Sequence, residues 1–242
     1  MRPPPRKNQR EKTMLNIGGY QKTTLLDYPG KLAATVFIGG CNFRCPFCHN
    51  SELFAPEELY DEEELLSIFK KRRGVLEGIA ITGGEPTLQA ELPDFMRKIK
   101  ELGLLEKLDS NGYRPEVLRS LIEEGLVDYI AMDIKNSPEH YGETAGFEKI
   151  DMSRIEESAQ LLKTCGIDHE FRTTVVPELH AEEDFEAIGR WLAGPDKYFL
   201  QGYRDSDMVY ERRFSQPAPQ LMRQIREIVL PYLPNTQIRG VD

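Results

Sequence analysis

Short apolar runs alternate with amphipathic windows along the chain. Six runs are rich in β-branched and aromatic residues and are followed by Gly, Asn, Asp or Pro, as is typical of strands. These candidate strands are Ala33–Ile38, Gly78–Thr82, Lys107–Ser110, Asp128–Asp133, His169–Val176 and Tyr198–Tyr203. The windows between them carry apolar residues at helical spacing, which predicts one buried face per helix. These windows are Glu57–Arg73, Gln89–Leu102, Pro115–Glu124, Asp151–Thr164 and Glu182–Leu192.

This alternation predicts an α/β fold built on a parallel sheet. Six strand–helix units fit an open α/β sheet or most of a β/α barrel, and the chain of 242 residues is slightly short of the about 250 that a full eight-stranded barrel needs. We expect the main domain to span 14–204. The segment 205–242 holds one helical window, Gln220–Leu230, and is expected to be a helical extension packed on the barrel.

The composition excludes several classes of protein. Apolar residues make up 40% and charged residues 29%, with a formal net charge of −9, which is typical of a soluble globular domain. The sequence has no apolar run long enough for a membrane span, and its acidity argues against nucleic acid as a partner. The expected setting is the reducing cytoplasm, where clustered cysteines bind metal or catalyse more often than they form disulfides.

The first thirteen residues differ in charge from the rest of the chain. They carry five cations and one anion, and they lack the apolar region of a secretory signal. We expect 1–13 to be a disordered basic extension, or to precede a true start at Met14. A tail that binds an anionic partner is the alternative.

Three cysteines within eight residues give the strongest chemical signal. Cys41, Cys45 and Cys48 follow the first predicted strand with the spacing C-x3-C-x2-C, and thiolates on one loop suit an iron–sulfur cluster or zinc. Zinc needs a fourth ligand, such as His49 or Cys165, but no second C-x2-C unit is present. The spacing therefore favours a four-iron cluster with one iron open to substrate, and Cys165 is expected to be a core residue.

Polar residues follow the later strands, at the edge where β/α barrels carry their chemistry. Gly83 and Gly84 would let the backbone approach a ligand closely, and Glu85 adds an anion that suits an ammonium group. Further polar pairs are Asp109 with Ser110, Asp133 with Lys135, and Arg172 with Thr174. Each residue alone is an ordinary strand-end residue, but together, beside the cysteine loop, they predict a binding site.

These motifs together resemble the radical S-adenosylmethionine (radical SAM) superfamily. The cysteine spacing, with Phe47 before the third cysteine, matches its cluster motif, and Gly83-Gly84-Glu85-Pro86 matches its methionine-binding motif. More narrowly, the chain resembles the activating proteins of glycyl-radical enzymes, in particular those of anaerobic ribonucleoside-triphosphate reductase. The stretches that carry this narrower resemblance are Thr24–Gly30, Cys45–Asn50, Asp109–Gly112, Ala131–Lys135 and Phe171–Val176.

The resemblance implies a partial, open (β/α)6 TIM-type barrel and a role for each matched position. Cys41, Cys45 and Cys48 would bind a [4Fe–4S] cluster whose open iron chelates SAM. The implied SAM contacts are Phe47 at the adenine, Gly83, Gly84 and Glu85 at the methionine ammonium, Asp109 and Ser110 at the ribose and methionine end, and Lys135, Arg172 and Thr174 on the carboxylate or ribose side. Asp109 and Asp133 would also bind a monovalent cation.

The resemblance also implies an activity under anaerobic conditions. Reductive cleavage of SAM would give a radical that takes a hydrogen from a glycine of a partner enzyme, with a ferredoxin or flavodoxin as electron donor. One spare cysteine leaves no room for a second cluster, and Ser110 stands where the family usually has Thr. The alternatives are an enzyme that acts on a small molecule, such as a 7-carboxy-7-deazaguanine synthase, an activase of a pyruvate formate-lyase-type enzyme, and a non-catalytic zinc module.

Overall fold

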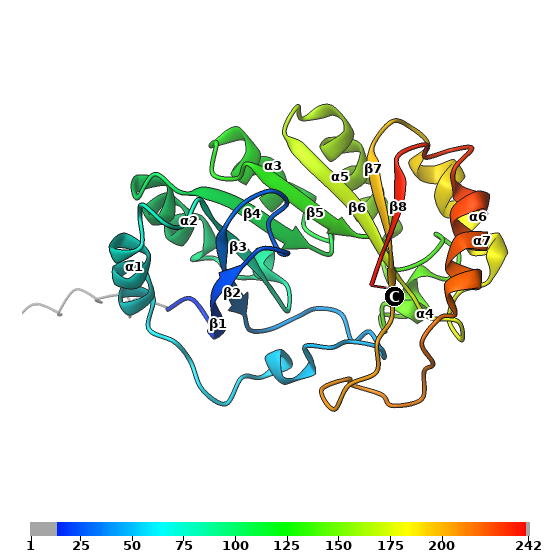
Figure 1. Cartoon of the computed structure of the whole chain (residues 1–242), viewed down its shortest axis with the longest axis horizontal. Helices are drawn as coiled ribbons and strands as arrows, with labels where there is room; N and C mark the ends of the chain where they lie inside the picture. Colours follow the sequence, from blue (N-terminus) through cyan, green and yellow to red (C-terminus); the bar gives the residue numbers. More distant parts are fainter. Residues whose placement is uncertain (1–13, 241–242) are drawn as a thin grey trace, which may run out of the picture.

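The computed structural model describes residues 14–240, so the expected basic extension at 1–13 lies outside the described residues. Within them the chain forms one eight-stranded sheet whose spatial order follows the sequence (Figure 1). The strands are β1 Ile17–Thr24, β2 Ala33–Ile38, β3 Gly78–Gly83, β4 Leu105–Ser110, β5 Tyr129–Asp133, β6 Asp168–Val175, β7 Lys197–Gly202 and β8 Thr236–Arg239. β1 runs antiparallel to β2, and all later neighbours are parallel.

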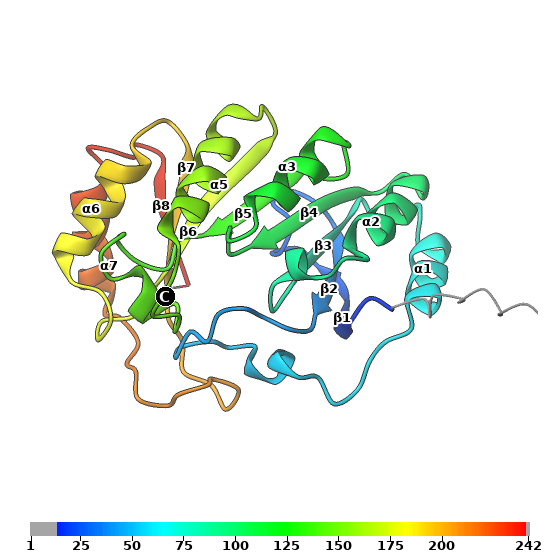
Figure 2. The ribbon, with the colours of Figure 1, turned by 180° about the vertical axis from the view of Figure 1, so that it is seen from behind.

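The helices lie on the outer side of the curved sheet (Figures 1 and 2). They are α1 Glu62–Lys71, α2 Leu92–Glu101, α3 Pro115–Glu123, α4 Tyr141–Thr144, α5 Met152–Thr164, α6 Glu182–Leu192 and α7 Pro219–Val229, with short 3-10 turns at Ser51–Phe54 and Pro86–Leu88. Helix α1 shows why the boundaries fall where they do. The Asp61 side chain accepts a hydrogen bond from the Glu64 amide at 2.8 Å and caps the first turn.

Alternation along β6 separates an apolar core from a polar interior. On β6, Phe171 and Val175 are fully buried in the apolar core. Their neighbours Glu170 and Arg172 point to the concave side of the sheet, where they contact other charged residues. The concave side therefore has the polar character of a binding site.

The structure confirms the expected open α/β barrel and its six parallel strands, β2 to β7, each within two residues of its predicted bounds. Two strands were not predicted. β1 contains two glycines and several polar residues, and β8 has only four residues, so neither shows the apolar pattern of a buried strand. The expected helical extension after 204 contains α7, and it also contains β8, which extends the sheet beside β7. Between 14 and 240, no helix is long and apolar enough to cross a membrane.

Candidate active site

A cavity of about 280 Å³ opens at the carboxyl ends of the parallel strands. It brings together every predicted site residue except Glu85. The predicted residues that line it are Cys41, Cys45, Phe47, Cys48, Gly83, Gly84, Asp109, Ser110, Asp133, Lys135, Arg172 and Thr174. The strand ends meet here because the strands are parallel and hydrogen-bonded in sequence order.

The three cysteines of the loop after β2 face this cavity. Cys45 is buried, and its thiol donates to the Ala145 carbonyl at 3.7 Å. Burial raises the pKa of Cys41 to about 11 and that of Cys45 to about 12, and it also raises the pKa of Cys48. The thiols of the metal-free chain are therefore protonated at neutral pH, and a metal centre must displace those protons when it binds.

The donor set fits an iron–sulfur cluster better than a single ion. Among residues 14–240, no group of three or more His, Cys, Asp or Glu side chains is arranged to hold one metal ion. Cys41, Cys45 and Cys48 instead lie around one cavity as separate thiols. A four-iron cluster offers a different iron to each thiolate, so its ligands do not have to converge on one point.

A segment from the far end of the sequence supports the cysteine loop. The Tyr210 amide donates to the Cys48 carbonyl at 3.0 Å, and the Glu211 amide donates to the Pro46 carbonyl at 2.9 Å. Ser51 adds a third link, since its hydroxyl donates to the Met208 carbonyl at 2.7 Å. Figure 1 shows the orange segment between β7 and α7 beside the cyan loop. This contact joins backbone groups about 160 residues apart, so no local sequence pattern signals it.

The glycine pair after β3 is required by neighbouring backbone. A Cβ on Gly84 would lie 2.1 Å from the Gly40 carbonyl oxygen, and a Cβ on Gly83 would lie 2.4 Å from the Ile38 backbone. Gly83 also has a φ of +120°, which side chains other than glycine rarely adopt. The Glu85 amide completes the contact by donating to the Gly40 carbonyl at 2.8 Å. The glycines thus let the end of β3 pack against the cysteine loop. Gly83 and Gly84 line the cavity together with the three cysteines.

Glu85 has a different place from the one expected. Its side chain is fully buried below the cavity wall, so its carboxylate does not line the cavity. It accepts hydrogen bonds from the amides of Thr87 and Asn111, at 3.1 and 2.6 Å, and from the Ser110 hydroxyl at 2.9 Å. Burial raises the pKa of Glu85, although these hydrogen bonds oppose that shift. Glu85 therefore joins the loops after β3 and β4.

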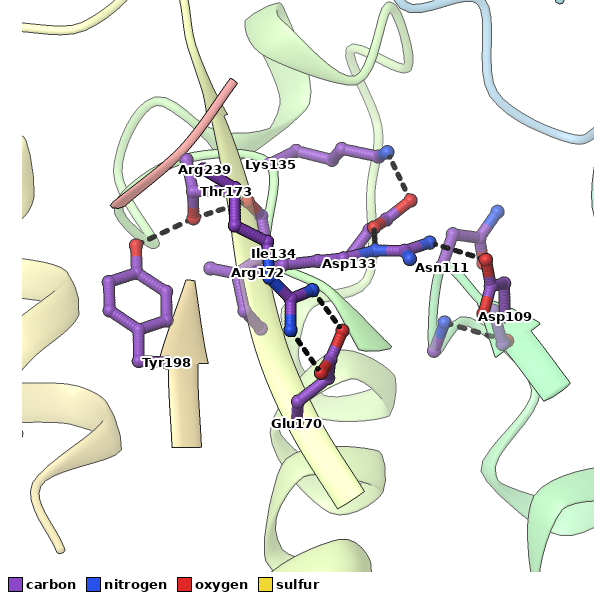
Figure 3. A network of polar contacts seen from close by, with 12 residues as sticks. Asp109, Asn111, Asp133, Ile134, Lys135, Glu170, Arg172, Thr173, Tyr198 and Arg239 are labelled. Carbon is purple, nitrogen blue, oxygen red and sulfur yellow. Dashed lines mark hydrogen bonds and ion pairs between the residues drawn. The ribbon is translucent and has the colours of Figure 1, made fainter. Parts of the chain in front are cut away.

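A charged network forms the opposite wall of the cavity (Figure 3). The Arg172 guanidinium bridges two carboxylates: it lies 3.0 Å from an Asp109 oxygen and also donates to Asp133. The Lys135 ammonium donates to the other Asp133 oxygen at 2.9 Å. Lys107, only 2% exposed, donates to Asp109 from two residues earlier on β4. The network thus alternates anions and cations.

The network keeps four of its groups charged: Asp109, Asp133, Lys135 and Arg172. Burial alone would raise the pKa of Asp109 and Asp133, but the Arg172 guanidinium and the neighbouring lysines lower both below the ordinary value. Burial disfavours the Lys135 ammonium, but Asp133 more than offsets it and raises the lysine pKa. At the cavity itself Lys135 and Arg172 face Asp109 and Asp133, and Lys107 adds a third cation behind Asp109.

Sequence analysis missed Lys107, although the signal was present. Lys107 and Asp109 are two residues apart on β4, where alternation places them on one face, and Lys135 follows Asp133 by two positions just beyond the end of β5. Asn111 was also missed as a site residue. Its side-chain amide donates to the Asn42 side chain at 2.8 Å and so ties the β4 end to the cysteine loop.

Comparisons with known proteins agree with this geometry. The family model of the radical SAM superfamily matches residues 35–192. A candidate glycyl-radical enzyme activating enzyme of Methanocaldococcus jannaschii is 32% identical over 241 residues, covering 93% of this chain and 96% of that protein. The 7-carboxy-7-deazaguanine synthase of Thermococcus kodakarensis is 27% identical over 175 residues, covering 63% of this chain and 67% of that protein.

The fold has a counterpart among solved structures. Streptococcus suis SuiB, bound to its precursor peptide SuiA, superposes with a TM-score of 0.66 at 14% identity over 83% of this chain. The chain spans 46% of the length of SuiB, so the likeness concerns the barrel. The superfamily implies a [4Fe–4S] cluster and SAM as cofactors. The protein is therefore an enzyme of the radical SAM superfamily, and within it belongs with the relatives of the glycyl-radical enzyme activating proteins.

Proposed function

We propose that the protein generates a glycyl radical on anaerobic ribonucleoside-triphosphate reductase. The observation that carries the proposal is the extent of the similarity to the activating-enzyme relative, which covers 93% of this chain and 96% of that protein. The match is long enough to take in the Met208–Glu211 segment as well as the barrel. The reductase as the specific partner rests on the resemblance of the strand-end motifs.

In this proposal the cavity residues divide between the two cofactors. Cys41, Cys45 and Cys48 hold the [4Fe–4S] cluster, which supplies the electron that cleaves SAM to a radical able to take a glycine hydrogen. Phe47 offers a ring for the adenine. The glycine loop offers its backbone to the methionine end, and Lys135 and Arg172 offer their positive charge to the SAM carboxylate.

The remaining polar residues orient the bound SAM. Ser110 and Thr174 offer hydroxyls along the cavity wall. Asp109 and Asp133 hold Arg172 in one direction, so that its guanidinium is fixed before the ligand arrives. Glu85 acts from below the wall, through the loop that carries Ser110 and Asn111.

A monovalent cation near Asp109 and Asp133 belongs to the proposal with one condition. Each carboxylate oxygen of the pair is already in contact with Arg172, Lys107 or Lys135. A cation would therefore bind there only if one of these side chains turned toward SAM, and those that line the cavity are Lys135 and Arg172. SAM binding that is equal in potassium, sodium and choline chloride would argue against the cation.

The test is anaerobic reconstitution with iron and sulfide, followed by reduction and addition of SAM. We expect about four irons per chain, SAM cleavage, and a glycyl radical, seen by electron spin resonance, when the reductase is added. A radical formed only on a pyruvate formate-lyase-type enzyme would identify that enzyme, and not the reductase, as the partner. A colourless protein with one zinc and no SAM cleavage would overturn the function. The electron donor, a ferredoxin or flavodoxin, and a cytoplasmic setting are parts of the same proposal.

A small-molecule enzyme is the second candidate. The similarity to the 7-carboxy-7-deazaguanine synthase favours it, although it covers only 63% of this chain. If the protein is such a synthase, the reconstituted protein should bind a pterin-like substrate and couple SAM cleavage to its conversion. SAM cleavage that depends on such a substrate, with no radical on any glycyl-radical enzyme, would decide for this candidate.

A further inference from the structure

The C-terminal strand reaches the interior of the barrel through one ion pair. Arg239 on β8 extends across β7, with its guanidinium 3.2 Å from the centre of the Phe199 ring, and meets Glu170 on β6. Two hydrogen bonds join the pair, at 2.9 and 3.1 Å (Figure 3). The Tyr129 hydroxyl donates to the same carboxylate at 2.8 Å. The Glu170 side chain is 1% exposed, so its charge is compensated by these partners and not by water.

Glu170 lies on the same face of β6 as Arg172. The two residues are separated by one position, and alternation points both to the concave side. The negative charge of Glu170 is among those that act on the Arg172 guanidinium, together with the charges of Asp109 and Asp133. Arg172 therefore has three carboxylates within its field, but the two that it contacts are those of the cavity wall.

We propose that Arg239 is a positioning residue: by occupying the Glu170 carboxylate, it keeps Arg172 at the wall of the SAM cavity. Without Arg239, a buried and uncompensated carboxylate would lie one position along the strand from Arg172. Such a charge draws the nearest available cation, because a lone buried ion is costly. The inference deepens the proposed function, since it concerns how the SAM site is built, and it extends that site to the last strand of the sheet.

The competing explanation is that the pair only fastens β8 to the sheet. The two explanations differ in what they predict when both charges are removed together. If Arg239 acts by neutralising Glu170, then Glu170→Gln should repair Arg239→Met, because no carboxylate remains to attract Arg172. If the pair is merely a fastener, the double variant lacks it as completely as Arg239→Met does, and stays equally impaired.

The experiment measures SAM binding to the reconstituted holoenzyme by anaerobic equilibrium titration. We expect Arg239→Met to raise the Kd of SAM by about tenfold or more, because it leaves the buried Glu170 carboxylate without its cation. Glu170→Gln alone, and the double variant, should stay within about threefold of the wild type. A second readout is the Nε–H resonance of Arg172 in the metal-free protein, which should shift in Arg239→Met and return in the double variant.

Two outcomes would overturn the proposal: Arg239→Met binds SAM as tightly as the wild type, or the double variant binds it as weakly as Arg239→Met. If Arg239→Met does not fold, the double variant still tests the proposal, because weak SAM binding by it would overturn the proposal. Arg239→Lys, which keeps the charge, should lie near the wild type. None of these measurements involves the partner enzyme, so failure to find a glycyl radical would leave their interpretation unchanged.

Discussion

The buried carboxylate of Glu85 and the hydroxyl of Ser110 are joined by a hydrogen bond of 2.9 Å. The bond links the loop after β3 to the loop after β4, and the Asn111 amide adds a second link at 2.6 Å. Ser110 faces the cavity while Glu85 lies beneath it. Glu85 thus holds Ser110 and Asn111, which line the cavity, from one layer beneath it.

Replacing Glu85 by Gln should weaken both stability and SAM binding. The amide nitrogen would face hydrogen-bond donors where a carboxylate oxygen now accepts, which costs about 1–3 kcal/mol for a buried group. Urea unfolding and SAM titration measure the two effects. Glu58→Gln, at an exposed position before α1, is the matched control and should change neither. Unchanged SAM affinity in Glu85→Gln would show that the two loops do not need this link.

Replacing Gly84 by Ala should displace the cysteine loop. The added Cβ would lie 2.1 Å from the Gly40 carbonyl oxygen, so the backbone must move. We expect the free energy of unfolding to fall by about 1–3 kcal/mol, as in other overpacked sites. We also expect a lower iron content after reconstitution. Gly74→Ala meets no atom within 4 Å and serves as the control. Equal iron content in the two variants would contradict the close approach seen here.

Replacing Cys45 by Ala should abolish iron–sulfur incorporation and SAM cleavage while the barrel stays folded. Cys165→Ala is the matched control, because Cys165 lies at the end of α5, where its thiol contacts the Leu162 carbonyl at 3.3 Å. Iron analysis and the visible spectrum separate the two variants. Retained SAM cleavage in Cys45→Ala would refute the ligand assignment.

Replacing Glu106 by Gln should stabilise the fold at high pH. Glu106 is fully buried, both of its carboxylate oxygens lack a hydrogen-bond partner among the described residues, and burial raises its pKa from 4.5 to about 9. Between these values the folded chain binds one proton more than the unfolded chain, so this residue lowers stability as the pH rises. Without the carboxyl group, this fall in stability with rising pH should disappear.

We expect Glu106→Gln to exceed the wild type by about 1–3 kcal/mol at pH 8 and by little at pH 5. Urea unfolding of the metal-free protein between pH 5 and 9, under reducing conditions, measures the difference. Glu101→Gln, on the exposed side of α2, is the control and should follow the wild type. A constant difference at all pH values would show that Glu106 is not protonated in the folded chain.

Much of the fold could be predicted because its signals are local. The strands β2 to β7 are apolar runs that end in turn residues, and the helices carry one apolar face each, so short stretches of sequence are sufficient to find them. β1 and β8 are different. Their residues form strands because they pair with β2 and β7, and their own patterns do not require it.

The same division applies to the site. The cysteine spacing, the glycine pair and the strand-end polar residues are contiguous motifs, and the sequence by itself was enough to predict that Cys41, Gly84, Asp133 and Arg172 would share one cavity. Lys107 could have been added by the same alternation argument. These predictions hold because a parallel sheet brings the carboxyl ends of its strands to one edge.

Only the tertiary structure decided what each side chain contacts there. It turned the Glu85 carboxylate away from the cavity, because donors on two loops compete for it more favourably than open space does. It also brought Tyr210 to Cys48 and Arg239 to Glu170. Contacts between residues so distant along the chain depend on how the whole sheet curves and closes, and no local pattern of apolar and polar residues encodes that geometry.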